Sequence, residues 1–238
     1  MKISDIKDIK AIVWDLEQTL YPYDEAFQKE SRKALARTIL ELGIEMTGQE
    51  AFDYAEAAYP MRTIKRLVND FDVDFEEGFY TYYNNLDPLF LNPSQSFTQG
   101  LNNSKVAHGL LTNANRNWTD KALYALGLEA VFDVKNIVSI DDMNGASKSN
   151  DTAPYQMICT MLDIDTKNSV MVDDKTKNLY QAKKLGMMTV LITGGDKNPD
   201  TSHADFIFDT AEEFLHKFNQ VRNMSVQAKP SYNKPKLK

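Results

Sequence analysis

Three aspartates stand directly after short apolar runs of the sequence. Asp15 follows Ala11–Trp14, and Asp173 with Asp174 follows Ser169–Val172. A carboxylate nucleophile splits a phosphoryl transfer into two steps, and Mg²⁺ prefers hard carboxylate oxygens. An aspartate after a strand is often only a turn residue or a helix cap. The prediction of a phosphoryl-transfer site therefore rests on the combination of these residues.

Three further polar residues have the same relation to predicted elements. Thr112 and Asn113 end the apolar run Val106–Leu111, and Lys148 precedes a helical segment. A hydroxyl group would bind phosphoryl oxygens, and a lysine would offset the charge of the phosphate and of the nucleophile. Together these residues occupy four places along the chain, each at the end of a predicted strand or the start of a predicted helix. Such an order is hard to obtain by chance.

Strands and helices alternate along most of the chain. The short, mostly β-branched runs predict strands, and the segments of helical period between them predict helices. This alternation predicts βαβ units and a largely parallel sheet. Because ligands bind beyond the carboxyl ends of such strands, the polar residues are expected to meet there. The predicted strands are Ala11–Trp14, Val106–Leu111, Ile137–Ile140, Ser169–Val172, Met188–Ile192 and Phe206–Phe208, with helices over Asp120–Leu126, Ala153–Leu162 and Asn178–Leu185.

One interval breaks the alternation. Residues 23–99 contain helical or irregular patterns, with helices predicted over Glu25–Leu42, Gln49–Ala58, Arg62–Asn69 and Phe75–Asn84. The aromatic residues of this interval are expected to fill a core of its own. The predicted fold is a three-layer, Rossmann-like α/β core with a parallel sheet (residues 1–22 and 100–222) and an inserted helical cap (23–99). Residues 223–238, with prolines and lysines, predict a disordered basic tail.

The order of the polar residues resembles the haloacid dehalogenase superfamily. Leu20-Tyr21-Pro22 further resembles the subgroup that includes pyrimidine nucleotidases. The cap interval after the first motif also matches the family pattern. The motifs that carry the resemblance are Asp15-Leu16-Glu17-Gln18-Thr19-Leu20 for Asp-x-Asp-x-Thr, Leu111-Thr112-Asn113 for the second motif, Lys148 for the third, and Val172-Asp173-Asp174, followed by Asn178 and Ala182, for the acidic fourth.

The resemblance implies a Mg²⁺-dependent phosphohydrolase that cleaves a small phosphomonoester, such as a nucleotide or sugar phosphate, through an aspartyl-phosphate. In the phosphatases of the family, the residue at the position of Glu17 acts first as a general acid and then as a general base. The implied catalytic residues are Asp15, Glu17, Thr112 and Lys148; the substrate-binding residues are Leu16, Thr112, Asn113 and Lys148; and the metal ligands are Asp15, Glu17 through its carbonyl, Asp173 and Asp174.

Two departures from the family pattern bear on activity. Glu17 stands where the phosphatases of the family have Asp, and such a change displaces the carboxyl by about one ångström, a misplacement that can cost on the order of 10²-fold in rate. Lys148-Ser149-Asn150-Asp151 replaces the usual Lys-Pro-x-Pro. The alternative is a catalytically weak or inactive relative that binds a phosphorylated ligand or a protein. A dehalogenase is a third reading, which the acid at position 17 and the metal site disfavour.

Bulk composition narrows the class of protein further. The net charge of −7 disfavours general binding of nucleic acid polymers. No apolar window approaches a membrane span, and the single Cys159 fits a reducing cytoplasm. Cys159, Trp14 and His108 are expected in the core, Gly194-Gly195 in a turn, and Asp141-Asp142 in a solvated loop.

Overall fold

The structure, a computed structural model, describes residues 6–58 and 63–227. A parallel sheet of order β3-β2-β1-β4-β5-β6 lies at its centre. Since β1 pairs with both β2 and β4, residues that follow these three strands emerge side by side. The predicted parallel α/β fold is confirmed. The strands are β1 (Ala11–Trp14), β2 (Ala107–Leu111), β3 (Ile137–Val138), β4 (Ser169–Asp173), β5 (Met188–Ile192) and β6 (Phe206–Phe208).

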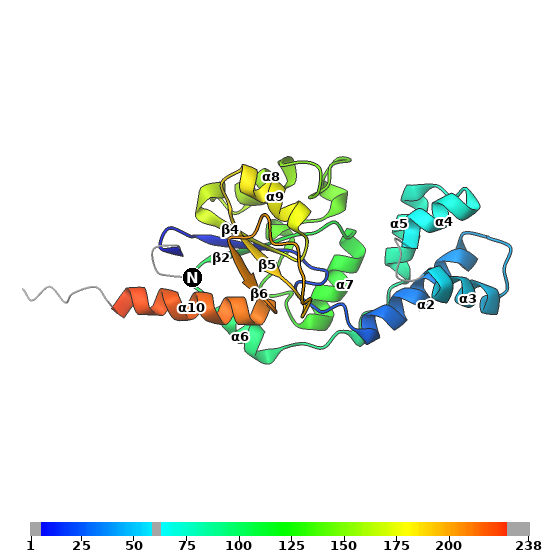
Figure 1. Cartoon of the computed structure of the whole chain (residues 1–238), viewed down its shortest axis with the longest axis horizontal. Coiled ribbons are helices and arrows are strands. Elements are labelled where there is room, and N and C mark those ends of the chain that lie inside the picture. The colour runs from blue at the N-terminus through cyan, green and yellow to red at the C-terminus, as the bar shows by residue number, and fades with distance from the viewer. Residues whose placement is uncertain (1–5, 59–62, 228–238) are drawn as a thin grey trace, which may run out of the picture.

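Helices cover both faces of this sheet, as Figure 1 shows. The side chains of β1 alternate between the two layers. Trp14 packs with Trp118 and Phe214 in one apolar cluster, whereas Val13 packs with Tyr155 in the other. The first layer contains α6 (Gln95–Asn103), α7 (Arg116–Leu126) and α10 (Ala211–Gln227), and the second contains α8 (Ala153–Met161) and α9 (Thr176–Lys184).

Local signals in the sequence explain where several elements end. Asn115 begins α7, because its side chain accepts a hydrogen bond from the amide of Trp118 at 2.9 Å. Gly127 ends the same helix at φ 67°, a left-handed conformation that favours glycine. The strand predicted over 137–140 stops at Val138, because the Asp142 carboxylate caps Ser139 and closes a 3₁₀ turn (η3, Ile140–Asp142). Further 3₁₀ turns of the same length are η1 (Pro88–Phe90), η2 (Val134–Asn136) and η4 (Thr166–Asn168).

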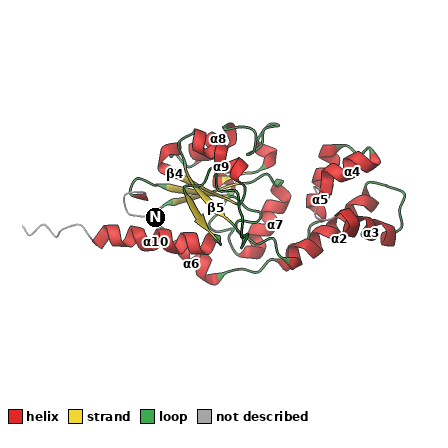
Figure 2. Cartoon of the chain, viewed as in Figure 1, coloured by secondary structure: helices red, strands yellow, loops and turns green. Residues whose placement is uncertain are grey.

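Four helices between β1 and α6 form a separate lobe beside the sheet (Figure 2). They are α2 (Glu25–Glu41), α3 (Gly48–Ala58), α4 (Thr63–Phe71) and α5 (Phe75–Asn85), and they lie where the helical cap is expected. In α3, Ala51, Ala55 and Ala58 are buried, while Phe52 lies beside this buried stripe and is 38% exposed. The expectation that all the aromatic residues fill the core of the cap is therefore wrong, because helical phase turns Phe52 and the exposed Phe75 outward.

The predicted domain limits at 99 and 222 both fall inside helices. Helix α6 packs against α10, and Asn219 donates a hydrogen bond to the carbonyl of Gly100 at 2.9 Å. Helix α10 continues to Gln227, because no proline or glycine interrupts the chain before Pro230. The remainder of the predicted tail, 228–238, lies outside the described residues.

Candidate active site

Asp15 extends the ladder of β1 by one residue and lies at the carboxyl end of the sheet. Its amide donates to the carbonyl of Val172 at 2.9 Å, and the residue is only 4% exposed. Thr19 donates to Asp15 Oδ2 at 3.0 Å across a turn in which Gln18 has φ 60°. This turn fixes the direction of the Asp15 carboxylate.

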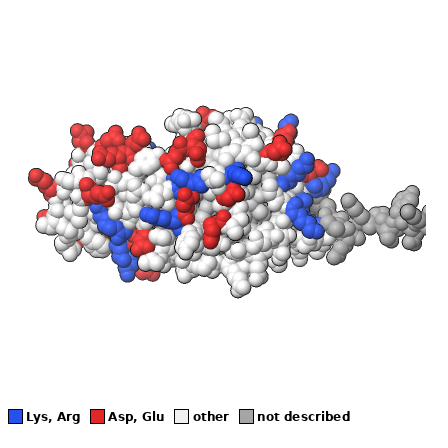
Figure 3. Space-filling view, turned by 180° about the vertical axis from the view of Figure 1, so that it is seen from behind, with Lys and Arg blue, Asp and Glu red and all other residues white. Residues whose placement is uncertain are grey.

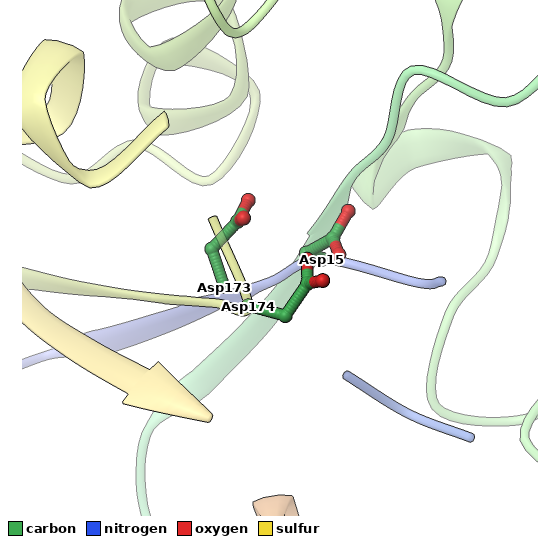
Figure 4. A group of neighbouring side chains, drawn as sticks. All are labelled: Asp15, Asp173 and Asp174. Carbon is green, nitrogen blue, oxygen red and sulfur yellow. The ribbon is translucent and has the colours of Figure 1, made fainter. Parts of the chain in front are cut away.

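Asp173 and Asp174 lie at the end of the neighbouring strand β4. Figure 4 shows that they and Asp15 bring their carboxylates together from two strands. One oxygen of each lies within 4.8 Å of the others. Asn178 donates to both Asp173 oxygens at 2.9 and 3.1 Å, and the Lys175 amide donates to Oδ1 at 2.8 Å. Asp173 is therefore rigidly held.

Lys148 is buried between two of these carboxylates. Its ammonium forms ion pairs with Asp15 and, at 2.8 Å, with Asp173. Burial by itself would lower the pKa of Lys148, but the charges of Asp15 and Asp173 raise it above its ordinary value. Lys148 is therefore a fixed cation at the centre of the site.

Side-chain hydrogen bonds hold the Lys148 loop in the absence of the prolines of the family pattern. Asn113 Oδ1 accepts from the Lys148 amide at 3.1 Å, and the Tyr155 hydroxyl donates to the Lys148 carbonyl at 2.9 Å. Asn150 Oδ1 accepts from the Ser147 amide at 2.9 Å within the loop itself. Asn113 thus contributes by positioning Lys148, a role that sequence reasoning missed.

The carboxylates outnumber the cations among them. Burial raises the pKa of Asp15 well above its ordinary value; Lys148 opposes this shift, and Asp173 and Asp174 add to it. Burial and Asp173 raise the pKa of Asp174 to about 6, against the opposing effect of Lys175. Removal from water and mutual repulsion both disfavour the ionised forms. A divalent cation bound among these carboxylates would relieve this repulsion.

Glu17 lies in the same turn but faces the cap. The Tyr83 hydroxyl of α5 donates to Glu17 Oε2 at 2.9 Å. The pKa of Glu17 is raised above its ordinary value, because the effect of burial exceeds the opposing effects of the hydrogen bond from Tyr83 and of the charge of Lys148. The Glu17 carboxylate is not part of the trio that lies within 4.8 Å.

The other predicted site residues occupy the same end of the sheet. Thr112 is fully buried after β2, and its hydroxyl oxygen accepts from the Ala114 amide at 3.0 Å. The hydroxyl proton of Thr112 is thus available to an acceptor. The Leu16 side chain is fully buried in the apolar core, so only its backbone can contribute to binding.

Lys175 and Tyr83 are site residues that the sequence did not indicate. Lys175 forms an ion pair with Asp174 at 2.6 Å and donates to Gln18 Oε1 at 3.3 Å. Its position directly after the aspartate pair was the available signal. A cavity of about 730 Å³ opens beside this pair and reaches the loop of Gly194 and Gly195. Both glycines have positive φ and form a turn, as expected.

Residues expected in the core are found there. Trp14 is fully buried and donates to Nδ1 of the buried His108 at 3.1 Å, and Cys159 is a buried free thiol. Asp141 and Asp142 are exposed, as expected of a solvated loop, and their carboxylates also cap local structure. Asp142 caps the η3 turn, and Asp141 accepts from the Arg116 amide at 2.7 Å.

The arrangement of these elements defines a class of protein. A parallel α/β sheet with a carboxylate trio and a buried lysine at its carboxyl ends, beside a helical lobe inserted after β1, is the architecture of a capped Rossmann-like hydrolase. A family model described as haloacid dehalogenase-like hydrolase matches residues 9–186, and the chain belongs to this family. The predicted superfamily and a hydrolytic enzyme are thereby confirmed. No curated protein matches the chain in sequence.

Solved structures similar to this chain include three from bacteria and archaea. A HAD phosphatase from Thermococcus onnurineus has 20% identity and a TM-score of 0.59, covering 88% of this chain and 97% of that one. CbbY from Rhodobacter sphaeroides, in complex with phosphate, has 18% identity and a TM-score of 0.61, with 87% and 96% covered. A putative beta-phosphoglucomutase from Thermotoga maritima has 18% identity and a TM-score of 0.62, with 90% and 100% covered. At such low sequence identities, the structural similarity to these proteins establishes the fold of this chain and nothing more.

Proposed function

We propose that this chain hydrolyses a small phosphomonoester through an aspartyl-phosphate on Asp15. The observation that carries the proposal is the buried ion pair of Lys148 with Asp15 and Asp173, beside Asp174. A cation that contacts the nucleophile offsets its repulsion with a phosphate dianion. Membership of the hydrolase family supports the same reaction class.

In the proposed reaction, an Asp15 oxygen attacks phosphorus and the ester P–O bond breaks. Glu17 gives a proton to the departing alkoxide oxygen. Glu17 then takes a proton from water, and the oxygen of this water attacks the phosphoryl group, which releases phosphate and restores Asp15. Lys148 and the Thr112 hydroxyl, with the amides of the turn from Leu16, are the proposed donors to the phosphoryl oxygens.

The residues present fit a magnesium ion. Asp15, Asp173 and Asp174 offer hard oxygen atoms within 4.8 Å of one another. Burial first, and neighbouring negative charge second, raise the pKa values of Asp15 and Asp174; a dication would balance that charge. Bound there, Mg²⁺ would supply charge neutralisation for the phosphoryl group. The carbonyl of Glu17 is the further ligand that the resemblance implies.

The proposed substrate is a small phosphorylated metabolite, either a sugar phosphate or a nucleotide. The beta-phosphoglucomutase name among similar structures favours the first; the Leu20-Tyr21-Pro22 resemblance to pyrimidine nucleotidases favours the second. On the face in Figure 3, acidic side chains gather over the cap, so attraction of an anion falls to local lysines.

We further propose a cytoplasmic enzyme, on the basis of its single cysteine. No helix in the described part of the chain is long and apolar enough to cross a membrane. An inactive binding relative is the less favoured alternative, because the chain belongs to a hydrolase family and its proposed nucleophile, Asp15, keeps a buried lysine partner.

The test measures phosphate release from an aryl phosphate and from panels of sugar phosphates and nucleoside monophosphates. Wild type and Asp15→Asn are assayed with Mg²⁺ and with EDTA. We expect magnesium-dependent release that falls by at least about 10³-fold in Asp15→Asn. A folded wild type that releases no phosphate above this variant would exclude the proposed activity.

A further inference from the structure

Tyr83 of the cap is directly bonded to the residue that departs from the family pattern. Its hydroxyl donates to Glu17 Oε2 at 2.9 Å, although 66 residues separate the two in the chain. Tyr83 is 9% exposed and packs edge-on against Phe79, with ring centroids 4.7 Å apart. The phenol is therefore fixed in the cap while its hydroxyl reaches the core.

The longer side chain of Glu17 creates a positioning problem. Compared with Asp, Glu has one more methylene and one more rotatable bond, and its carboxyl lies about one ångström farther from the backbone. Without a partner, this carboxyl would sample several rotamers, and ordering it costs free energy. A hydrogen bond from a rigid phenol selects one of them.

We propose that Tyr83 is a positioning residue that holds the Glu17 carboxyl for proton transfer, so that the docked cap completes the site. This inference rests on the proposed function. The contact explains how the chain can use Glu at position 17, because the Tyr83 hydroxyl of the cap binds the carboxyl at the distance that the longer side chain reaches. An Asp at this position would leave a gap to Tyr83 beyond hydrogen-bond distance.

Other contacts hold α5 on the core and so keep Tyr83 in reach. The Tyr80 hydroxyl donates to Asp141. Asn117 donates to Asn84 Oδ1 at 2.6 Å, and Lys121 donates to the Asn84 carbonyl at 3.1 Å. Because these contacts join α5 to η3 and α7, Tyr83 meets Glu17 through a docked helix rather than through one isolated bond.

The neighbouring tyrosine provides a matched control. Tyr82 is 8% exposed and bonds through its hydroxyl to Ser31 Oγ at 2.7 Å, within the cap. Tyr82→Phe and Tyr83→Phe each remove one buried hydroxyl from the same helix. Only the second removes a contact with Glu17.

The experiment compares kcat/KM for an alkyl phosphate and for an activated aryl phosphate. An alkyl leaving group needs a proton from Glu17, whereas an activated aryloxide leaves without one. We expect Tyr83→Phe to lower kcat/KM for the alkyl ester about tenfold and for the aryl ester less than about threefold. Tyr82→Phe should change both by less than about twofold.

The same two phenylalanine substitutions are then made in the Glu17→Asp background. Because the shorter carboxyl of the Glu17→Asp variant does not reach Tyr83, Tyr83→Phe should change kcat/KM there by less than about twofold. In parallel, urea midpoints are measured for the wild type, Tyr83→Phe, Glu17→Met, which has no strong acceptor for the Tyr83 hydroxyl, and the double variant that combines these two changes. They report coupling between the two side chains independently of turnover. The loss for the double variant should be smaller than the sum of the single losses.

The outcomes separate this inference from the proposed function. Equal losses for the two esters, or an undiminished Tyr83→Phe effect beside Glu17→Asp, would overturn positioning by Tyr83 while the phosphatase stands. Additive urea midpoints would also overturn it. A wild type that hydrolyses neither ester would overturn the proposed function, and the positioning role of Tyr83 would be overturned with it.

Discussion

Lys148 and Asp173, 25 residues apart in the chain, form a buried ion pair with an N–O distance of 2.8 Å. The pair lies at the end of β4, and the same lysine also pairs with Asp15 of β1. One cation therefore ties together carboxylates from two adjacent strands. Its removal affects both the chemistry and the fold.

Lys148→Met is expected to abolish phosphate release and to lower the free energy of unfolding by about 3–5 kcal/mol, because it leaves two buried carboxylates unpaired. Urea unfolding without Mg²⁺ measures the second effect. The control is Lys183→Met, which breaks the exposed pair with Asp205 and should cost less than about 1 kcal/mol. Equal stability losses in the two variants would contradict the central role of Lys148.

Magnesium is expected to raise the melting temperature of the wild type. A ligand that binds only the folded state stabilises it by about 2.7 kcal/mol at one hundred times its Kd. In Asp174→Asn the shift should fall strongly, because one of three carboxylates is lost. Thermal unfolding with increasing Mg²⁺ checks this without an activity assay; an equal shift in wild type and variant would place the ion elsewhere.

Acid is expected to destabilise the fold through His108. Burial lowers the pKa of His108 to about 4, whereas the unfolded chain takes up this proton near pH 6.5. Stability is therefore complete above about pH 6.5 and declines towards pH 4, where the loss reaches about 3 kcal/mol. His108→Gln should flatten this decline in urea midpoints between pH 7 and 4.5.

The exposed His216 supplies the control for that titration. His216→Gln is expected to leave the wild-type pH dependence unchanged. A wild-type slope retained in His108→Gln would show that other groups cause the acid sensitivity.

Gly109→Ala is expected to destabilise the sheet by about 1–3 kcal/mol through overpacking. An added Cβ would lie 2.9 Å from Leu162 Cδ1 and 3.0 Å from Ile158 Cγ1, which pack beneath β2. Gly48→Ala is the control, because its Cβ would meet nothing within 4 Å. Thermal unfolding should show a lower melting temperature for the first variant alone; a Gly109→Ala protein as stable as the wild type would mean that α8 yields easily.

Much of the fold was readable because its strands are short and mostly apolar. The bounds of β1, β5 and β6 agree with the predicted runs; β1 and most of β5 are buried, and buried parallel strands favour continuous apolar residues. Helices α6 and α10 were not predicted as helices. Polar residues surround the few apolar residues of α6, so the sequence shows no clear helical pattern there. These apolar residues become buried only when α6 packs against α10.

The order of the chemistry could be predicted from the sequence: a carboxylate after β1, a hydroxyl after β2, a lysine, and then two aspartates at the end of β4. These positions follow from strand ends, which are local properties. The packing of distant segments sets how Lys148 is held without prolines, by Asn113 and Tyr155, and which cap residue meets Glu17. Such contacts depend on the packing of segments far apart in the chain, and no local pattern encodes that packing.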